Sequence, residues 1–481
     1  MRVCRLNLTL NRVLIMKTAI GLMIAFFGLT ACTAHYHVNQ AVTSIEVVEG
    51  YSLKKEPGDP RSDELLVILT FSGGGTRAAA FSYGVLKALA QTQIAINGKK
   101  RRLIDEIDAI SAVSGGSFTA AYLGLFGDRI FKDFEKKFLK QDVQSKLIKR
   151  VLSPLNWFKL GSIYFTRSDL AADYYDQLLF EHKTFRDFKT SEGPLIAINA
   201  TDIAMGSQFS FIGSQFTPIC TDLLSYPVSR AVTASSAVPG AFPSIILKNY
   251  AGTCHYRLPE WATKALKQRQ VTTRQYQQAK RLNAYLDVKK YPYIHLLDGG
   301  ISDNLGIRLL VNATLTEDEL WNKLKDLNLT NTKKLAIITV NAQKETDKTF
   351  AQRDYSIPLI DTFGAASSIP LDQYSFETME LLRNNISIWR ELITAGRCPQ
   401  ARSQSTKIKE GTPGADPPCT VQAYLIEVSF DMMQDQNERE YLKSLPTTFH
   451  LEPTDVDRLI AAALEILQNS KVFQALVSDL Q

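Results

Sequence analysis

The chain lacks a large excess of charge of either sign, and it is poor in glycine and proline. Its 481 residues carry a formal net charge of +6, but the first 31 residues hold four basic residues and no acidic one, which leaves only +2 for the rest. A chain so close to neutral offers no clustered Lys/Arg field, which excludes nucleic acid as a partner. With only 26 Gly and 18 Pro, collagen-like repetition and wholesale disorder are excluded as well.

Metal-binding patterns are also missing. The six histidines and six cysteines form no set with the spacing of a zinc site, so the sequence predicts neither a metal nor another cofactor. Once Cys4 and Cys32 are assigned to the amino-terminal segment described below, four cysteines remain, which allow three connectivities. Cys398 and Cys419 enclose a polar run rich in Pro and Gly, so we expect them to pair, and Cys220 would then pair with Cys254.

The apolar run near the amino terminus is too short to span a membrane. It covers Thr18–Thr30, 13 residues, whereas a spanning helix needs roughly 20. Because basic residues precede it, we expect residues 1–31 to be a secretory signal, with Met16 as a possible true start. The run ends in Leu-Thr-Ala-Cys32, which resembles the bacterial lipobox and predicts a lipid on Cys32. A plain signal peptide is the alternative.

This amino-terminal pattern also predicts a location. Thr33, rather than Asp, follows the cysteine, which favours lipid anchoring at the outer membrane of a Gram-negative cell envelope. Residues 32–62 are largely polar and end in breaker residues, so we expect a tether between the anchor and a domain over 63–481.

Short apolar runs alternate with helical patterns after the tether. Leu65–Phe71 reads as a strand buried on both faces and Ile107–Val113 as another strand, and a helix is expected over Thr76–Gln91 between them. This alternation predicts an α/β fold with a parallel, helix-covered sheet. Further strands are expected over Pro194–Asn199, Tyr293–Leu297, Lys334–Asn341 and Ala423–Phe430.

The first motif that carries chemistry is a glycine loop, Gly73-Gly74-Gly75-Thr76-Arg77, between a strand and a helix start. Backbone amides there can face negative charge, as in a phosphate cradle or an oxyanion hole. No Gly-Lys-Ser/Thr and no G-x-G-x-x-G pattern supports a nucleotide site. A tight turn that serves packing alone is the other interpretation.

The second motif is Ala112-Val113-Ser114-Gly115-Gly116. A serine on a sharp strand-to-helix turn is a candidate nucleophile, and small neighbours are needed because that turn is strained. Ala112 stands where the usual pattern has glycine, which leaves the backbone angles of the turn open. We interpret Ser111 and Ser117 as structural.

The third motif is Asp298-Gly299-Gly300, directly after a strand. A serine nucleophile needs a base, and Asp298 at the carboxyl end of its strand is the candidate. His295 lies three residues earlier and therefore faces the other side of the strand. His450 could complete a Ser/Asp/His order, and a simple turn is the remaining interpretation of the motif.

These three motifs, in this order, resemble the patatin-like phospholipase family. Asn-Ala-Thr-Asp at 199–202 and Ala234–Pro243 look like further family segments, and the resemblance covers about residues 65–341. It implies a central mixed, mostly parallel sheet flanked by helices, with the chain from about residue 342 as an extension. It also implies a Ser114/Asp298 dyad without histidine, with Gly73, Gly74, Gly75 and Arg77 forming or supporting an oxyanion hole.

The expected activity is then hydrolysis of carboxylic esters of phospholipid or lysophospholipid through an acyl-enzyme. A catalytically idle lipid-binding lipoprotein on the same fold is the alternative, and a phosphate-binding module is a third possibility.

The segment Arg129–Arg150 combines a basic surface with an apolar stripe. It carries eight basic and three acidic residues, and residues 151–165 add aromatic side chains typical of membrane interfaces. One interpretation is a surface helix that packs its stripe on the domain. The other is a cap beside Ser114 that binds anionic lipid through Lys136, Lys137 and Lys140.

Overall fold

A computed structural model of the chain describes residues 36–46, 50–56, 58–96, 98–313, 317–344, 351–352, 354, 356, 358–398 and 419–481. The predicted signal peptide over 1–31 and the predicted lipid site at Cys32 lie outside these residues. Within the described ranges, no helix combines the length and the hydropathy that crossing a membrane requires.

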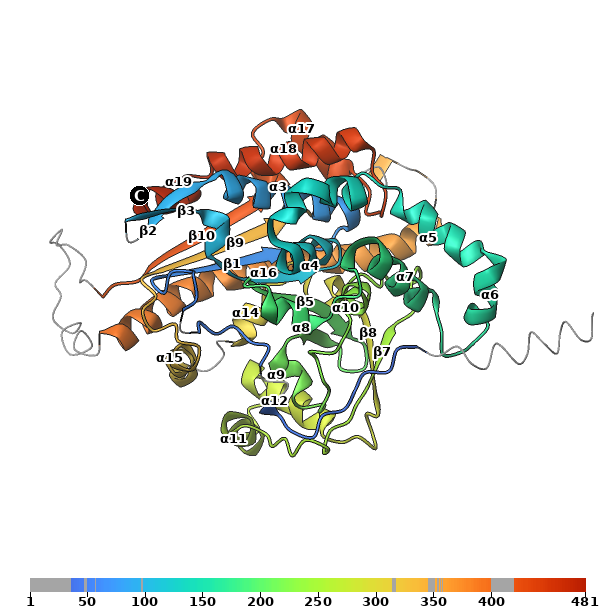
Figure 1. Cartoon of the computed structure of the whole chain (residues 1–481), viewed down its shortest axis with the longest axis horizontal. Coiled ribbons are helices and arrows are strands. Elements are labelled where there is room, and N and C mark those ends of the chain that lie inside the picture. Colours follow the sequence, from blue (N-terminus) through green and yellow to red (C-terminus); the bar gives the residue numbers. More distant parts are fainter. Residues whose placement is uncertain are drawn as a thin grey trace, which may run out of the picture.

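One large sheet runs through the molecule in the order β10-β9-β1-β4-β5-β8-β7, and β6 pairs with β5 (Figure 1). The pairs on the β10 side of β5 are parallel, whereas β5–β6, β5–β8 and β7–β8 are antiparallel. The strands are β1 (Leu65–Phe71), β4 (Ile107–Val113), β5 (Leu195–Asp202), β6 (Ser207–Phe211), β7 (Ile245–Lys248), β8 (Tyr293–Asp298), β9 (Lys334–Asn341) and β10 (Gln422–Ser429). A separate hairpin consists of β2 (Gln93–Ile96) and β3 (Lys99–Arg102).

Helices cover both faces of this sheet. Alternate residues of its central strands point to opposite sides, and both sets include apolar residues that pack against helices. Leu65, Val67 and Leu69 of β1 belong to the core that includes α3, α4 and α18, whereas Leu66 and Ile68 pack with α16 on the other face. The helices nearest the site are α3 (Gly75–Gln91), α4 (Gly115–Phe126), α10 (Val228–Ser235) and α13 (Gly300–Asp303). The other longer segments are η3 (Ile130–Leu139), α5 (Val143–Leu152), α6 (Pro154–Leu160), α7 (Arg167–Tyr175), α11 (Glu260–Gln268), α12 (Arg274–Tyr285), α15 (Glu317–Asp326), α16 (Leu359–Arg397), α17 (Gln436–Ser444), α18 (Pro453–Asn469) and α19 (Lys471–Asp479).

The carboxyl-terminal extension completes the sheet. Strand β10 pairs along its whole length with β9, and α18 packs against α3, the first helix after the glycine loop. The described strand β10 and helix α18 of this extension therefore share the hydrophobic core of the rest of the chain.

The predicted tether is different in the structure, because its described residues pack on the domain. Asn39 donates to Thr221 Oγ1 over 2.9 Å, and Val42 N donates to the carbonyl of Cys220 over 2.9 Å. Farther along, Tyr51 is buried and donates to the carbonyl of Ile196 over 2.9 Å. The polar composition of residues 32–62 predicts a free spacer, but these polar groups bond to the domain instead.

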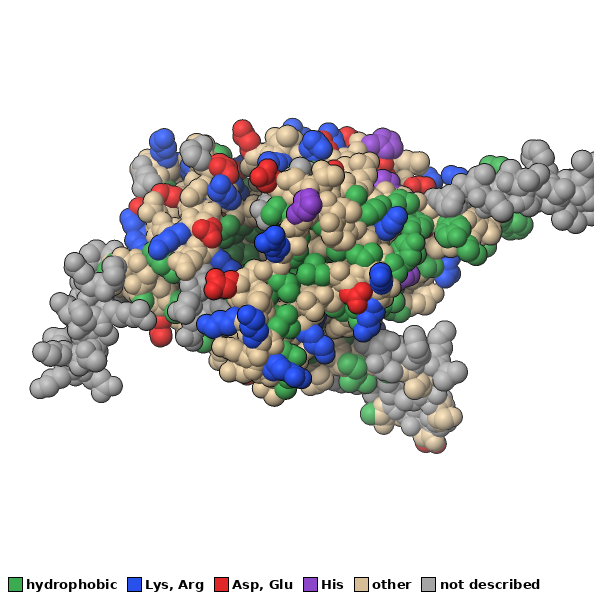
Figure 2. All heavy atoms as spheres, turned by 90° about the horizontal axis from the view of Figure 1, so that it is seen from below, with side chains coloured by type: hydrophobic (Ala, Val, Ile, Leu, Met, Phe, Trp, Pro, Cys, Tyr) green, Lys and Arg blue, Asp and Glu red, His purple; other side chains and the backbone are tan. Residues whose placement is uncertain are grey.

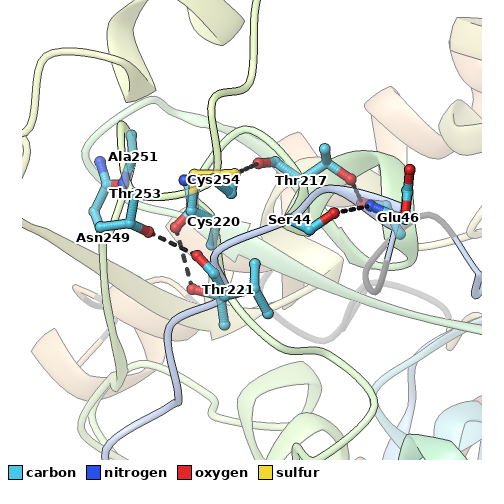
Figure 3. The surroundings of a disulfide bond; sticks show 12 residues. Ser44, Glu46, Thr217, Cys220, Thr221, Asn249, Ala251, Thr253 and Cys254 are labelled. Atoms are coloured by element: carbon cyan, nitrogen blue, oxygen red, sulfur yellow. Dashed lines mark hydrogen bonds between the residues drawn. A yellow bond between two sulfur atoms is a disulfide. The ribbon is translucent and has the colours of Figure 1, made fainter.

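A disulfide between Cys220 and Cys254 lies where this segment docks (Figure 3). Thr221 and Thr253, each next to one of the cysteines, both bond to the segment, since Thr253 Oγ1 donates to the carbonyl of Val42 over 2.9 Å. A second disulfide joins Cys398 to Cys419. These are the two pairs predicted from the sequence.

Candidate active site

Ser114 lies on a sharp turn between β4 and α4. Its backbone has φ 47° and ψ −119°, a combination that an L-residue adopts only under strain, and such strain concentrates at functional sites. Ala112 lies at the end of β4, two residues before Ser114, and is fully buried. The turn therefore forms with alanine in place of the usual glycine. This answers the question that the sequence left open about the backbone angles of the motif.

Ser114 and Asp298 are in direct contact. The Ser114 hydroxyl donates to Asp298 Oδ2 over 2.8 Å, and the other carboxylate oxygen accepts from the Gly300 amide over 2.8 Å. Both residues are buried. A nucleophile and a base within hydrogen-bond distance are the minimum that proton transfer requires.

The topology that brings the two residues together differs from the expected one. The prediction placed both at the carboxyl edge of a parallel sheet, but β8 runs antiparallel to β5. The pairing between β8 and β5 involves only the last three residues of β5, and Asp298 lies opposite Ala200. On the other side of β5, Val113 lies opposite Asn199. Ser114 and Asp298 therefore lie on either side of the same part of β5, although β4 and β8 run in opposite directions.

Burial raises the pKa of Asp298 to about 6, against the lowering effect of the hydrogen bonds from Gly300 and Ser114. A carboxyl with this pKa is mostly ionised at pH 7, yet it binds a proton far more readily than an exposed aspartate does. The pKa thus lies in the range that suits a general base near neutral pH.

The glycine loop lies against the turn that carries Ser114. A side chain on Gly115 would place its Cβ 2.0 Å from the carbonyl oxygen of Gly75, so only glycine permits this approach. Within the described part of the chain, the amides of Gly74 and Gly75 bond to no acceptor, whereas Gly73 N donates to the carbonyl of Asn304 over 3.0 Å. Two amides at the start of α3 are thus available beside Ser114, as an oxyanion hole requires.

The family model described as patatin-like phospholipase matches residues 69–311 of this chain, more than half of its 481 residues. The match spans the glycine loop, Ser114 and Asp298. This chain belongs to the patatin-like phospholipase family. Its central mixed, mostly parallel sheet flanked by helices is the fold that the resemblance implied.

Solved structures of human GIVD cytosolic phospholipase A2 are similar to this patatin-like chain. One has 12% identity and a TM-score of 0.44, with 95% of this chain and 66% of the other covered. The complex of the same enzyme with methyl gamma-linolenyl fluorophosphonate has 13% identity, a TM-score of 0.40 and coverage of 91% and 62%. This chain thus spans just under two thirds of their length. No curated protein matches it.

Neither histidine considered from the sequence bonds to the serine–aspartate pair within the described residues. His295 lies on the face of β8 opposite to Asp298, and its Nδ1 lies 3.1 Å from the hydroxyl of Ser244. His450 is partly exposed and its Nε2 lies 3.6 Å from Glu452. In the part of the chain that the structure describes, no three His, Cys, Asp or Glu side chains gather closely enough to hold a metal ion.

Arg77 binds the carboxyl-terminal extension with its guanidinium group, so a direct part in an oxyanion hole does not fit this patatin-like site. Its Nε donates to the carbonyl of Ala342 over 2.8 Å, and its terminal nitrogens donate to the carbonyl of Leu445 over 2.5 Å and to Thr447 Oγ1 over 3.0 Å. Burial lowers its pKa to about 10, which leaves it charged at neutral pH. Of the two roles that the resemblance offered, supporting the loop is the one that this geometry favours.

Two elements of the site were not assigned a role from the sequence. The hydroxyl of Ser235 accepts from the Ser114 amide over 2.8 Å and donates to the carbonyl of Asn199 over 2.6 Å, which ties the turn to β5. The carbonyl of Thr448 accepts from the Thr76 amide over 2.9 Å and covers Gly75. Ser235 belongs to the Ala234–Pro243 segment that supported the resemblance, whereas Thr448 lies outside the match and carries no sequence signal.

Proposed function

We propose that this protein is a lipid acyl hydrolase that cleaves carboxylic esters of phospholipid or lysophospholipid through a Ser114/Asp298 dyad. The hydrogen bond from the hydroxyl of Ser114, on its strained turn, to the buried carboxylate of Asp298 carries the proposal. Two amides of the glycine loop that bond to no acceptor among the described residues support it, and so does membership of the patatin-like phospholipase family.

The chemistry follows from the positions of these groups. Asp298 takes the hydroxyl proton as Ser114 Oγ attacks the ester carbonyl carbon, and the amides of Gly74 and Gly75 stabilise the tetrahedral oxyanion. As that intermediate collapses, Asp298 returns the proton to the departing alcohol oxygen and an acyl-serine remains. Water then gives a proton to Asp298 as its hydroxide adds to the acyl carbon. When this second intermediate collapses, Asp298 returns the proton to Ser114 Oγ, which releases the fatty acid and restores the serine. Removal of one oxyanion donor typically costs roughly 3–4 kcal/mol of barrier.

The proposed substrate fits the proposed location. A lipid on Cys32, with the outer membrane of a Gram-negative envelope as its destination, would keep the enzyme beside its ester-rich substrate. A Cys32→Ser chain that still needs detergent for release from the outer membrane would argue against this anchor.

The test is release of fatty acid from phospholipid and lysophospholipid by the full chain and its variants. Ser114→Ala should abolish release without changing thermal unfolding, because it removes only the attacking oxygen. His295→Ala is the matched control and should retain most of the activity. Lipid binding without fatty-acid release by the unaltered chain would indicate the idle lipid-binding alternative, and equal loss in both variants would overturn the two-residue mechanism.

A further inference from the structure

Helix α6 and the loop that follows it expose several large apolar side chains. No side chain of α6 is buried, and Leu155 and Ile163 are 81% and 85% exposed. The neighbouring exposed apolar residues are Ile148, Leu152, Trp157 and Tyr164. A helix of seven residues is not stable in water without packing, and contiguous exposed apolar residues mark an interaction surface. We name residues 143–165 the α5–α6 surface.

The α5–α6 surface and the three residues that follow it carry charge of one sign. Residues 143–168 contain no Asp or Glu and five basic residues: Lys146, Lys149, Arg150, Lys159 and Arg167. None of the five lies within ion-pair distance of a carboxylate in the described ranges. A second copy of this chain would bring like charges together across a symmetric contact. An anionic bilayer complements both the charge and the exposed Trp157.

The preceding segment behaves differently, which corrects the expectation for Lys137 and Lys140. In η3, Phe134 and Phe138 are buried in the core, as the packing interpretation predicts. Lys137 bonds to Asp133 over 3.0 Å, and Lys140 lies 3.3 Å from Glu135 and also contacts Asp457. These lysines are paired with carboxylates, so the lipid-binding character belongs to residues after 142.

The α5–α6 surface begins beside the site. Gln144 N, in the first turn of α5, donates to the carbonyl of Phe449 over 3.2 Å, and the preceding residue, Thr448, covers Gly75. The amino-terminal segment reaches the same region, because the ring of His37 contacts Tyr226 and lies in the field of Arg230 and Asp169, at the start of α7.

The pictures agree with this placement. Helices α5 and α6 project from the right-hand end of the molecule, and the first described residues lie at that end too (Figure 1). Seen from below, hydrophobic side chains extend from the middle of the face toward this projecting end (Figure 2). A membrane at this end would face both the start of α5 and the docked amino-terminal segment.

We propose that the α5–α6 surface is a membrane-docking surface that inserts Leu155, Trp157 and Ile163 into the interface of an anionic phospholipid bilayer. The inference rests on the proposed function in that a bilayer would present the ester substrate to Ser114. It adds a specific contact to the predicted lipid anchor, which would hold the chain near a membrane without orienting it.

The test uses the full chain carrying Ser114→Ala, so that vesicles stay intact and binding is read apart from turnover. Vesicles of phosphatidylcholine with phosphatidylglycerol contain brominated acyl chains, and the emission of Trp157 is obtained as the difference from a Trp157→Phe chain. We expect this emission to shift to shorter wavelength and to be quenched. An anchored chain whose Trp157 emission is unchanged would overturn the proposal, as would association of two copies through this surface.

A second measurement uses the active chain. Leu155→Gln with Ile163→Gln should lower hydrolysis of vesicle lipid roughly tenfold and leave hydrolysis of a small soluble ester unchanged. Val271→Gln with Ile388→Gln is the matched control, because these apolar residues are also exposed but lie elsewhere, and it should change neither rate. Equal loss on both substrates would overturn docking, whereas absence of hydrolysis of either substrate by the unaltered chain would instead refute the proposed function.

Discussion

Two buried aspartates of the same sheet, Asp108 and Asp298, share a raised pKa but differ in their partners. Burial raises the pKa of each to about 6. Asp108, in β4, lies 3.1 Å from the buried ammonium of Lys55 and 3.9 Å from Arg61. Among the described residues, Asp298 has no cation beside it, and its carboxylate accepts only from the Ser114 hydroxyl and the Gly300 amide.

The difference teaches that a perturbed pKa does not locate a catalytic site without the chemistry around it. At Asp108, two cations balance the carboxylate, and a hollow of about 600 Å³ opens beside them, lined in part by Lys55, Arg61 and Arg101. At Asp298, the neighbour is the Ser114 hydroxyl on a strained turn, next to two amides that bond to no acceptor in the described part of the chain. The groups that can transfer a proton lie at the other end of β4.

The largest expected difference is in activity. Asp298→Asn should lower kcat for ester hydrolysis by roughly 10⁴-fold, because the amide cannot accept the serine proton at neutral pH. Asp108→Asn, measured per folded molecule, should retain most of the activity. Steady-state rates on a soluble ester check both, and a comparable loss in the two variants would erase the proposed distinction.

The second difference is in stability, and here the substitution at Asp108 is expected to have the larger effect. Asp108→Asn leaves the Lys55 ammonium buried without its carboxylate, which should lower the free energy of unfolding by about 3–5 kcal/mol. The double change Asp108→Asn with Lys55→Met should recover part of that loss. Denaturant unfolding measures both values, and a single variant as stable as the unaltered chain would contradict the structural role of the pair.

The third prediction concerns pH. Because Asp298 must be ionised to accept a proton, kcat/KM should rise tenfold per pH unit below about 6 and level off above it. A folded pKa above the unfolded value of 3.8 means that the folded state binds more protons between about 4 and 6, so this group lowers stability as pH rises through that window. Asp298→Asn should therefore gain stability relative to the unaltered chain above pH 6. A flat rate profile from pH 5 to 8 would contradict the assignment of the base.

The smallest effect is expected at Arg77, which acts through the loop rather than on substrate. Arg77→Met removes three hydrogen bonds to residues 342–447, and we expect kcat to fall roughly tenfold with KM nearly unchanged, because the oxyanion donors lose their support. Arg77→Lys should recover part of the rate. A change confined to KM would mean that Arg77 contributes to binding instead.

The sequence was sufficient for the elements whose signal is local. The runs Leu65–Phe71 and Ile107–Val113 have the same bounds as β1 and β4, because strands buried on both faces are largely apolar. Ser114 and Asp298 could be found from short motifs, since a strained turn and a close backbone approach require small residues at fixed positions. Their contact, however, depends on the antiparallel pairing of β8 with β5, which no local pattern specifies.

Other features could not be predicted because they depend on distant parts of the chain. The segment 32–62 reads as a spacer, but Asn39 and Tyr51 bond to Thr221 and Ile196, which lie more than 140 residues away in the chain. Lys137 and Lys140 look available in the sequence, and only the fold shows that Glu181 lies near Lys137 and that Asp457 contacts Lys140. Thr448 reaches the glycine loop from outside the family match, so neither a motif nor the resemblance pointed to it.

The central claim, that Ser114 is a nucleophile activated by Asp298, is tested most directly by labelling the full chain with a fluorophosphonate and mapping the modified peptide. We expect one adduct on Ser114 in the unaltered chain and none in Ser114→Ala. Labelling should be slowed by orders of magnitude in Asp298→Asn but not in Asp108→Asn or His295→Ala. An adduct on another serine, or labelling of Ser114 at an unchanged rate in Asp298→Asn, would contradict it.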